Sequence, residues 1–156
     1  MDDINALRRL LRENHVIAVV GLSRDWYRPS YFAAKYMQEH GYRVIPVNPK
    51  YDEILGQKCY KSLREVPEKI DIVDVFRKTQ DVMPIAEEAI AIGAKVLWQQ
   101  LGVKNEAAAV KARAAGLDAV VDRCVKIEHG RLFGGLNWVG VNTRVISAKR
   151  PRWLAY

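Results

Sequence analysis

Residues 19–30, VVGLSRDWYRPS, decide the fold that we expect for this chain. They join an apolar segment, HVIAVV (15–20), to a segment with helical spacing (31–40) that stops at Gly41. A strand, a glycine and a helix in this order form the first unit of nucleotide-binding α/β domains. The G-x-G-x-x-G fingerprint is absent, and a loop with two serines and two arginines takes its place. We therefore expect a phosphate-binding turn built without those glycines.

The alternation of strand and helix continues along the chain. The expected strands are 15–20, 43–48, 70–76, 95–102 and 118–121, and the expected helices are 3–14, 31–40, 81–92 and 105–116, with Ser30, Asp81 and Asn105 as N-caps and a short helix from Ser62. Strands that are apolar almost throughout are typical of a parallel sheet with helices on both faces. We predict a single doubly wound, Rossmann-like α/β domain with a mostly parallel sheet over residues 1–130.

The character of the sequence changes near residue 130. Residues 131–156 mix glycines, Trp138, Trp153 and basic residues, with the densest positive charge at 149–152. We expect a basic C-terminal extension that packs on the domain or on a second subunit, which leaves a homo-oligomer open.

Composition restricts the class of protein. The chain has 156 residues, 49% of them hydrophobic, which is enough for one well-packed core. Its net charge of +7 indicates an anionic partner, either a polyphosphate ligand or nucleic acid. Cys59 and Cys124 lie far apart and form no zinc-binding or disulfide pattern. No apolar run has the length of a membrane span and the first residues lack a signal-peptide core, so we expect a cytoplasmic protein without a membrane partner.

The ligand site is expected at the carboxyl ends of the strands, where open parallel sheets bind ligands. After the first strand, Gly21 lets a ligand approach the backbone, and serines, arginines and a helix N-terminus offer donors to phosphate. After the second strand, Asn48, Pro49 and Lys50 replace the acidic residue that would bind the ribose of NAD. A lysine at this place favours a ligand with an additional phosphate, such as NADP or coenzyme A.

Several segments together resemble a known family. They are VVGLS…RPS, GYRVIPVNPKYDEILGQKCYKSL, DIVDVFR, AIAIGAKVLWQQLGVKNEAAA and DRCVKIEHGRL, spread over residues 10–133. This set is similar to the small stand-alone CoA-binding proteins and to the N-terminal CoA-binding domain of the succinyl-CoA synthetase α subunit. The resemblance implies a Rossmann-like fold with coenzyme A as its ligand.

The resemblance also implies roles for individual positions. It places the CoA phosphates at the loop 21–30, the phosphorylated ADP at Lys50, the adenosine at 76–77 and the pantetheine arm at 99–100. Arg24 and Arg28 join this set because of their charge. The expected cofactor-binding residues are Gly21, Leu22, Ser23, Arg24, Arg28, Pro29, Ser30, Asn48, Pro49, Lys50, Phe76, Arg77, Gln99 and Gln100.

We expect no catalytic or metal-binding residues. The synthetase uses a phosphorylated histidine in a second domain and a separate β subunit, and neither is recognisable in this sequence. His129 is expected to make a structural hydrogen bond, and Cys124 to be a small buried side chain. Asp71 and Asp74 are expected on opposite faces of one strand, with Asp74 bonded by backbone donors of a neighbouring loop. Trp98 is expected in the core.

The favoured hypothesis is therefore non-catalytic binding of coenzyme A or acyl-CoA, as a sensor or carrier. An NADP-linked enzyme on the same scaffold would also explain Lys50, but it lacks a recognisable hydride-transfer site. Nucleic-acid binding through the basic extension is a third hypothesis. It is disfavoured because Arg144, Trp153 and the cluster 149–152 make only a small stacking face. The acyl group, the downstream partner and the number of subunits are open.

Overall fold

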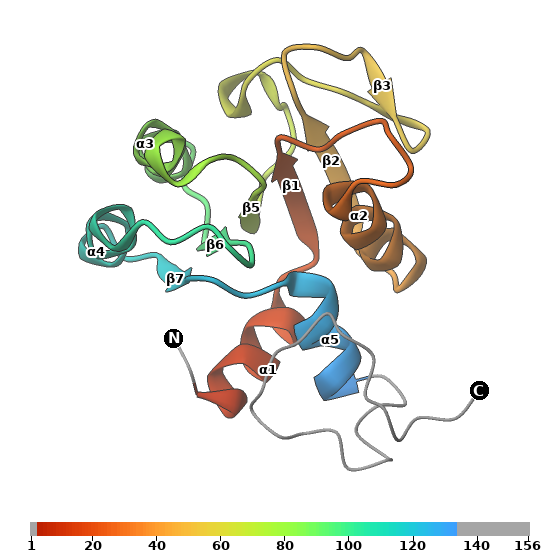
Figure 1. The fold of residues 1–156 in the computed structure, drawn as a ribbon. Coiled ribbons are helices and arrows are strands. Elements are labelled where there is room, and N and C mark those ends of the chain that lie inside the picture. The colour runs from red at the N-terminus through yellow and green to blue at the C-terminus, as the bar shows by residue number, and fades with distance from the viewer. Residues whose placement is uncertain (1–2, 134–156) are drawn as a thin grey trace.

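Five parallel strands form the centre of the molecule in the computed structural model, which describes residues 3–133 (Figure 1). They are β1 (Val16–Val20), β2 (Arg43–Val47), β5 (Ile72–Val75), β6 (Val96–Gln99) and β7 (Asp118–Val120). The spatial order is β2-β1-β5-β6-β7, and every neighbouring pair is parallel. The strand order therefore reverses between β1 and β5, where doubly wound sheets bind their ligands. The predicted parallel α/β sheet is confirmed.

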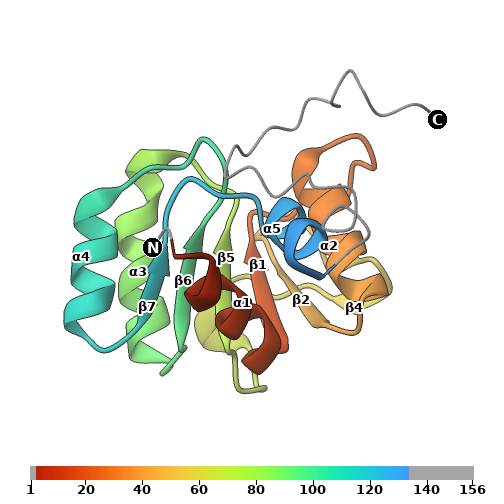
Figure 2. The same cartoon turned by 90° about the horizontal axis from the view of Figure 1, so that it is seen from below.

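Helices cover both faces of this sheet (Figure 2). Helices α1 (Ile4–Glu13), α2 (Pro29–Glu39) and α5 (Val125–Phe133) pack on one face, and α3 (Val82–Ala91) and α4 (Glu106–Ala114) pack on the other. Successive strand residues alternate between the two cores, so Trp98 packs with the α1, α2 and α5 side and Leu97 with the α3 and α4 side. Trp98 is fully buried, as predicted.

Helix α2 begins two residues earlier than expected. The predicted N-cap Ser30 lies inside the helix, whose first residue is Pro29 and whose N-cap is Arg28. Proline suits the first helical position because its φ is already helical and the N–H that it lacks would have no partner there. The Ser30 hydroxyl is thereby free to accept a hydrogen bond from the Ser23 N–H at 3.0 Å. By contrast, the predicted cap Asn105 does accept from the Ala108 N–H, at 3.0 Å.

A hairpin and a helix were not foreseen from local signals. A short hairpin, β3 (Glu53–Ile54) and β4 (Gln57–Lys58), surrounds the turn that was expected at Gly56. Helix α5 contains a glycine and crosses the predicted domain boundary at 130/131. Its buried Glu128 carboxylate pairs with Arg123 at 3.1 Å and with Arg131, and these local contacts form one ion group at α5. The predicted extension at 131–156 lies outside the described residues from 134 onward.

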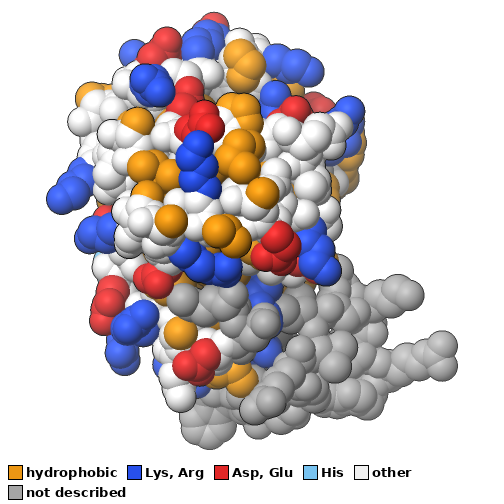
Figure 3. Space-filling model, turned by 90° about the vertical axis from the view of Figure 1, so that its left-hand side faces the viewer, with side chains coloured by type: hydrophobic (Ala, Val, Ile, Leu, Met, Phe, Trp, Pro, Cys, Tyr) orange, Lys and Arg blue, Asp and Glu red, His pale blue; other side chains and the backbone are white. Residues whose placement is uncertain are grey.

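Two surface properties bear on the class of partner. None of the helices described within residues 3–133 is long and apolar enough to span a membrane. On the side of the molecule seen in Figure 3, basic and acidic side chains are interspersed with small apolar patches. The positive charge on this face is therefore not collected into one continuous surface of the kind that a nucleic-acid backbone requires.

Candidate functional site

A cavity of about 640 Å³ opens at the carboxyl edge of the sheet, above the β1/β5 switch point. Loops that follow β1, β2, β5 and β6 line it together with the start of α5. The lining residues expected from the sequence are Gly21, Ser23, Arg28, Pro29, Ser30, Asn48, Lys50, Phe76, Arg77 and Gln100. The fold thus brings most of the candidate residues into one hollow.

The loop after β1 folds over the start of α2. The Ser23 N–H donates to the Ser30 hydroxyl, and the Asp25 N–H donates to the Ser23 hydroxyl at 3.1 Å. The Asn48 side chain donates to the Leu22 carbonyl at 3.1 Å and so ties this loop to the end of β2. The N-terminus of α2 carries a partial positive charge, which favours an anion beside it. This wall of the cavity is therefore suited to a phosphate.

Gly21 is required by the fold itself. Its φ is +87°, and a Cβ atom would lie 2.4 Å from the Phe76 carbonyl oxygen and 2.8 Å from Arg77 Cδ. The space beside its α-carbon, which we expected a ligand to use, is filled by the chain that leaves β5. The glycine lets the exits of β1 and β5 pack closely, and it thereby shapes the bottom of the cavity.

The loop after β2 supplies a second cationic wall. Its Lys50 N–H donates to Asn48 Oδ1 at 2.9 Å, and Lys50 and Tyr51 both line the cavity. Arg24 does not line the cavity; its guanidinium lies 5.2 Å from the centre of the Tyr51 ring and bridges the two loops at the rim. Pro49 lines a neighbouring hollow of about 340 Å³, which shares Gly21 and Arg77 with the main cavity.

The opposite wall is mostly apolar. Leu101 after β6 and Cys124 and Ile127 at the start of α5 line this end together with Gln100. Burial raises the pKa of the Cys124 thiol, so this thiol stays protonated at neutral pH. The sequence did not point to Ile127, because no local signal marked α5 as a helix beside the sheet edge. Leu101 was missed although it directly follows the expected Gln100. Asp25 and Tyr51 were also missed, although each adjoins an expected residue.

Asp74 lies in the core beside this wall. Its carboxyl is 1% exposed, and Oδ1 accepts a hydrogen bond from the Gln100 side-chain amide. Gln100 Oε1 in turn accepts from the Val125 N–H at 3.4 Å, which links Asp74 to the start of α5. Burial raises the pKa of Asp74 to about 7, although the Gln100 bond acts in the opposite direction. Unlike our expectation, no backbone donor bonds Asp74 within the described residues.

Backbone donors bond Asp71 instead. Its Oδ2 accepts from the N–H groups of His15 and Val16, each at 3.1 Å. Asp71 also pairs with Lys95 at 3.3 Å. Asp71 therefore lies at the polar start of the strand, whereas Asp74, three residues later, lies inside the core.

Leu22 and Gln99 do not reach the cavity, contrary to expectation. Leu22 is fully buried in the core. Gln99 accepts from the Asn105 N–H at 2.7 Å and donates to the Asn105 carbonyl at 2.9 Å, so it holds the loop after β6. Consecutive strand residues point to opposite faces, which is why only Gln100 of this pair faces the cavity.

All three histidines belong to one aromatic cluster, and none of them lines the cavity. The Tyr36 hydroxyl and His129 Nδ1 are 3.0 Å apart, which confirms the expected structural hydrogen bond. The His40 ring stacks on Tyr36 with centroids 3.9 Å apart, and His15 lies against Tyr42. Burial lowers the pKa of His129, and the neighbouring His40 lowers it further.

This cluster predicts a loss of stability in acid. The unfolded His129 takes up a proton below about pH 6.5, whereas the folded ring resists protonation to a lower pH. The stability contribution is complete above that pH and is lost as the pH falls through the folded pKa. Urea unfolding between pH 5 and 8 should show a smaller acid loss in His129→Gln than in the wild type. An unchanged pH profile in His129→Gln would contradict the prediction, and His15→Gln serves as the exposed control.

Comparison with known proteins agrees with this arrangement. Residues 15–130 match the family model described as CoA binding domain. The Bacillus subtilis protein named Uncharacterized protein YneT is 42% identical over 123 residues, which cover 79% of this chain and 91% of that protein. The structure of a hypothetical protein from Pyrococcus horikoshii is 45% identical with a TM-score of 0.83, and the match covers 86% of this chain and 96% of that one.

A longer enzyme contains a related segment. Acetate–CoA ligase [ADP-forming] of Methanocaldococcus jannaschii is 34% identical over 79 residues, which are 51% of this chain and 11% of the ligase. The resemblance to small CoA-binding proteins is thus confirmed over most of the described residues. The chain belongs to the CoA binding domain family.

Proposed function

We propose that this chain binds coenzyme A or an acyl-CoA in the cavity at the sheet edge and acts as a sensor or carrier without catalysing a reaction. The observation that carries the proposal is the polarity of the cavity. One wall has cations and a helix N-terminus, and the opposite wall is apolar. Coenzyme A has a matching polarity, with phosphates at one end and a thiol-bearing arm at the other.

The charged wall supports the phosphate end. Arg28, Lys50 and Arg77 line the cavity, whereas Asp25 is its only carboxylate among the described lining residues. Arginine can bind phosphate oxygens with two parallel hydrogen bonds, and lysine acts as a point charge. Lys50 follows β2, where an acidic residue would favour NAD, so we assign the 3′-phosphate of coenzyme A to Lys50.

The apolar wall supports the pantetheine arm or a short acyl group. Leu101, Cys124 and Ile127 present apolar surface, and Gln100 offers amide groups near them. A non-catalytic role is supported by the state of the reactive groups. Burial keeps the Cys124 thiol protonated, and the histidines are engaged with tyrosines away from the cavity.

Calorimetric titration of the purified full chain tests the proposal. We expect coenzyme A to bind about tenfold more tightly than dephospho-CoA, because a hydrogen bond to a charged group contributes roughly 1.5–3 kcal/mol. Lys50→Met should remove most of that preference. At a concentration of about 100 times its dissociation constant, coenzyme A should stabilise the fold by about 2.7 kcal/mol.

The same titration separates the alternatives. No binding heat and no thermal shift at millimolar coenzyme A would refute the proposal. Tighter binding of NADP than of coenzyme A, with competition between them, would favour the NADP-linked enzyme instead. Equal affinity for acetyl-CoA and coenzyme A would mean that the apolar wall does not distinguish the acyl group.

A further inference from the structure

The five residues 48–52, called the Lys50 loop below, form one wall of the cavity and are fixed at both ends by backbone bonds. The Asn48 N–H donates to the Tyr60 carbonyl at 2.9 Å, and the Cys59 N–H donates to the Asp52 carbonyl at 2.8 Å. These bonds continue the parallel bridge between Val47 and Tyr60. The ends of the loop are therefore part of the sheet edge and cannot move independently of it.

The apex of the loop has fewer constraints. Pro49 has no N–H to donate, and the Lys50 N–H bonds within the loop, to Asn48 Oδ1. Among the hydrogen bonds of residues 3–133, the Tyr51 carbonyl accepts one, from Lys61 Nζ at 3.2 Å. The same ammonium group lies 3.2 Å from Asp52 Oδ1. Lys61 thus bonds the backbone of the apex, whereas the Tyr51 ring is held separately by Arg24 and by packing on the core.

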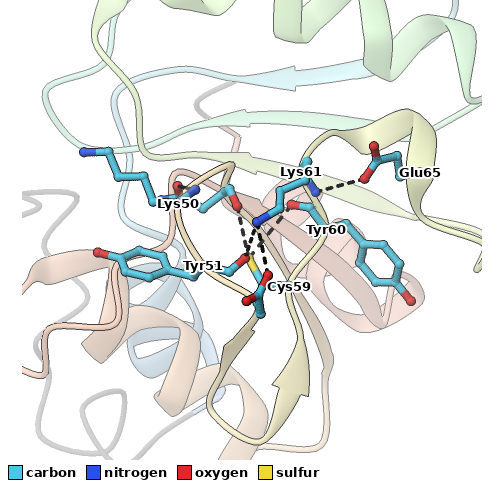
Figure 4. A network of polar contacts seen from close by, with 8 residues as sticks. Lys50, Tyr51, Cys59, Tyr60, Lys61 and Glu65 are labelled. Carbon is cyan, nitrogen blue, oxygen red and sulfur yellow. Dashed lines mark hydrogen bonds and ion pairs between the residues drawn. The ribbon is translucent and has the colours of Figure 1, made fainter.

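Lys61 approaches the loop from the neighbouring hollow of about 340 Å³, which it lines together with Pro49 and Arg77, and it does not line the main cavity. Figure 4 shows the Lys50 and Tyr51 side chains extending from one side of the loop, while the Lys61 ammonium reaches it from the other side. The backbone of Lys61 is itself held, because its N–H donates to Glu65 Oε2 at 3.1 Å. A charged donor on a fixed backbone makes a stronger bond to a carbonyl than a neutral donor does.

We propose that Lys61 is a positioning residue for the phosphate end of the cavity. It holds the apex of the Lys50 loop so that the Lys50 ammonium stands ready for the 3′-phosphate. This inference rests on the proposed function, with Lys50 as the partner of that phosphate. Holding a binding group in place before the ligand arrives removes an ordering cost from binding, so affinity rises without a new contact.

Two single variants and their combination test the inference in the full chain. Calorimetry measures the affinity of coenzyme A and of dephospho-CoA for the wild type, Lys61→Met, Lys50→Met and the double variant. We expect Lys61→Met to lower the affinity for coenzyme A about fivefold, which is the scale of one lost charge-assisted hydrogen bond. The affinity for dephospho-CoA should change less than about twofold. In the Lys50→Met background, Lys61→Met should have no further effect. Lys61→Arg should restore the preference, because a guanidinium group can donate to the same carbonyl.

A neighbouring lysine supplies the control. Lys58 on β4 is exposed, its ammonium lies 5.2 Å from the centre of the Tyr60 ring, and no hydrogen bond joins it to the Lys50 loop in the described residues. Lys58→Met removes the same charge from the same segment and should leave both affinities unchanged. If Lys58→Met lowered the affinity for coenzyme A as much as Lys61→Met does, the effect would come from the loss of positive charge alone, and the inference would be overturned.

The remaining outcomes are equally decisive. An undiminished effect of Lys61→Met in the Lys50→Met background would mean that Lys61 contacts the ligand itself, and it would overturn the positioning role. The positioning role would also be overturned if Lys61→Met lowered the affinity of both ligands equally, or if it lowered neither affinity. If the wild type binds neither ligand, the proposed function is refuted. If the wild type binds coenzyme A and Lys61→Met keeps the same preference for coenzyme A over dephospho-CoA, only the role of Lys61 is refuted.

Discussion

Gly21→Ala will lower the free energy of unfolding by roughly 2–5 kcal/mol, because it combines left-handed backbone strain with overpacking. The new Cβ would lie 2.4 Å from the Phe76 carbonyl oxygen, a distance that the backbone must relieve by moving. The exits of β1 and β5 would separate, and both of them line the cavity. Coenzyme A affinity should therefore fall at least about tenfold, the factor that corresponds to 1.4 kcal/mol of binding free energy. Urea unfolding and calorimetry measure the two effects.

Gly41→Ala separates strain from crowding. Gly41 has a φ of +89°, close to that of Gly21, but a Cβ there would meet nothing within 4 Å. Gly41→Ala should lower the free energy of unfolding by about 1–2 kcal/mol, the cost of the left-handed backbone conformation alone, and should leave ligand affinity unchanged. If the Gly21 and Gly41 variants lost equal stability, the close packing of the β1 and β5 exits would not be the cause.

Asp74→Asn will stabilise the protein at pH 8 by up to about 4 kcal/mol, the linkage scale for a carboxyl whose pKa moves this far on folding. In the wild type the folded pKa is raised to about 7 by burial. The unfolded carboxyl loses its proton above about pH 4, whereas the folded one keeps it until about pH 7. Stability therefore falls as the pH rises between these values, and the loss persists above them.

The amide imitates the protonated acid. Its oxygen can accept from Gln100 as Asp74 Oδ1 does, and it carries no charge at any pH. The advantage of Asp74→Asn should therefore fade as the pH falls toward 4. Urea unfolding at half-unit steps of pH measures this difference. The prediction fails if the wild type and the variant keep parallel profiles from pH 4 to pH 8.

Asp71→Asn is the matched control with the opposite sign. Burial raises the pKa of Asp71, but hydrogen bonds from the N–H groups of Val16 and His15 and from Lys95 outweigh it, so the pKa lies below its usual value. This carboxylate therefore stabilises the fold above the unfolded pKa, and that contribution is lost as the pH falls through the folded pKa. Asp71→Asn should destabilise the protein at neutral pH, where Asp74→Asn already stabilises it.

Some of the missed site residues show the limit of local patterns. The first residue after each strand was accessible from the sequence, because parallel strands present their carboxyl ends at one edge. Ile127 was not, because α5 lacks a clear helical pattern and its place beside the sheet edge depends on packing against α1 and α2. The choice between Gln99 and Gln100 depends on the exact end of β6, and local signals place strand ends only within a few residues.

The sequence by itself determined the alternation of strand and helix, the parallel sheet and the edge at which Gly21, Ser30 and Lys50 gather. Periodicity, glycines and caps are local properties, and in this class of fold they are sufficient to order the elements. Only the tertiary structure decided that Asp74 is buried, that α5 closes the cavity and that Lys61 supports the Lys50 loop. Those features depend on contacts between residues far apart in the chain, and such contacts leave no local trace.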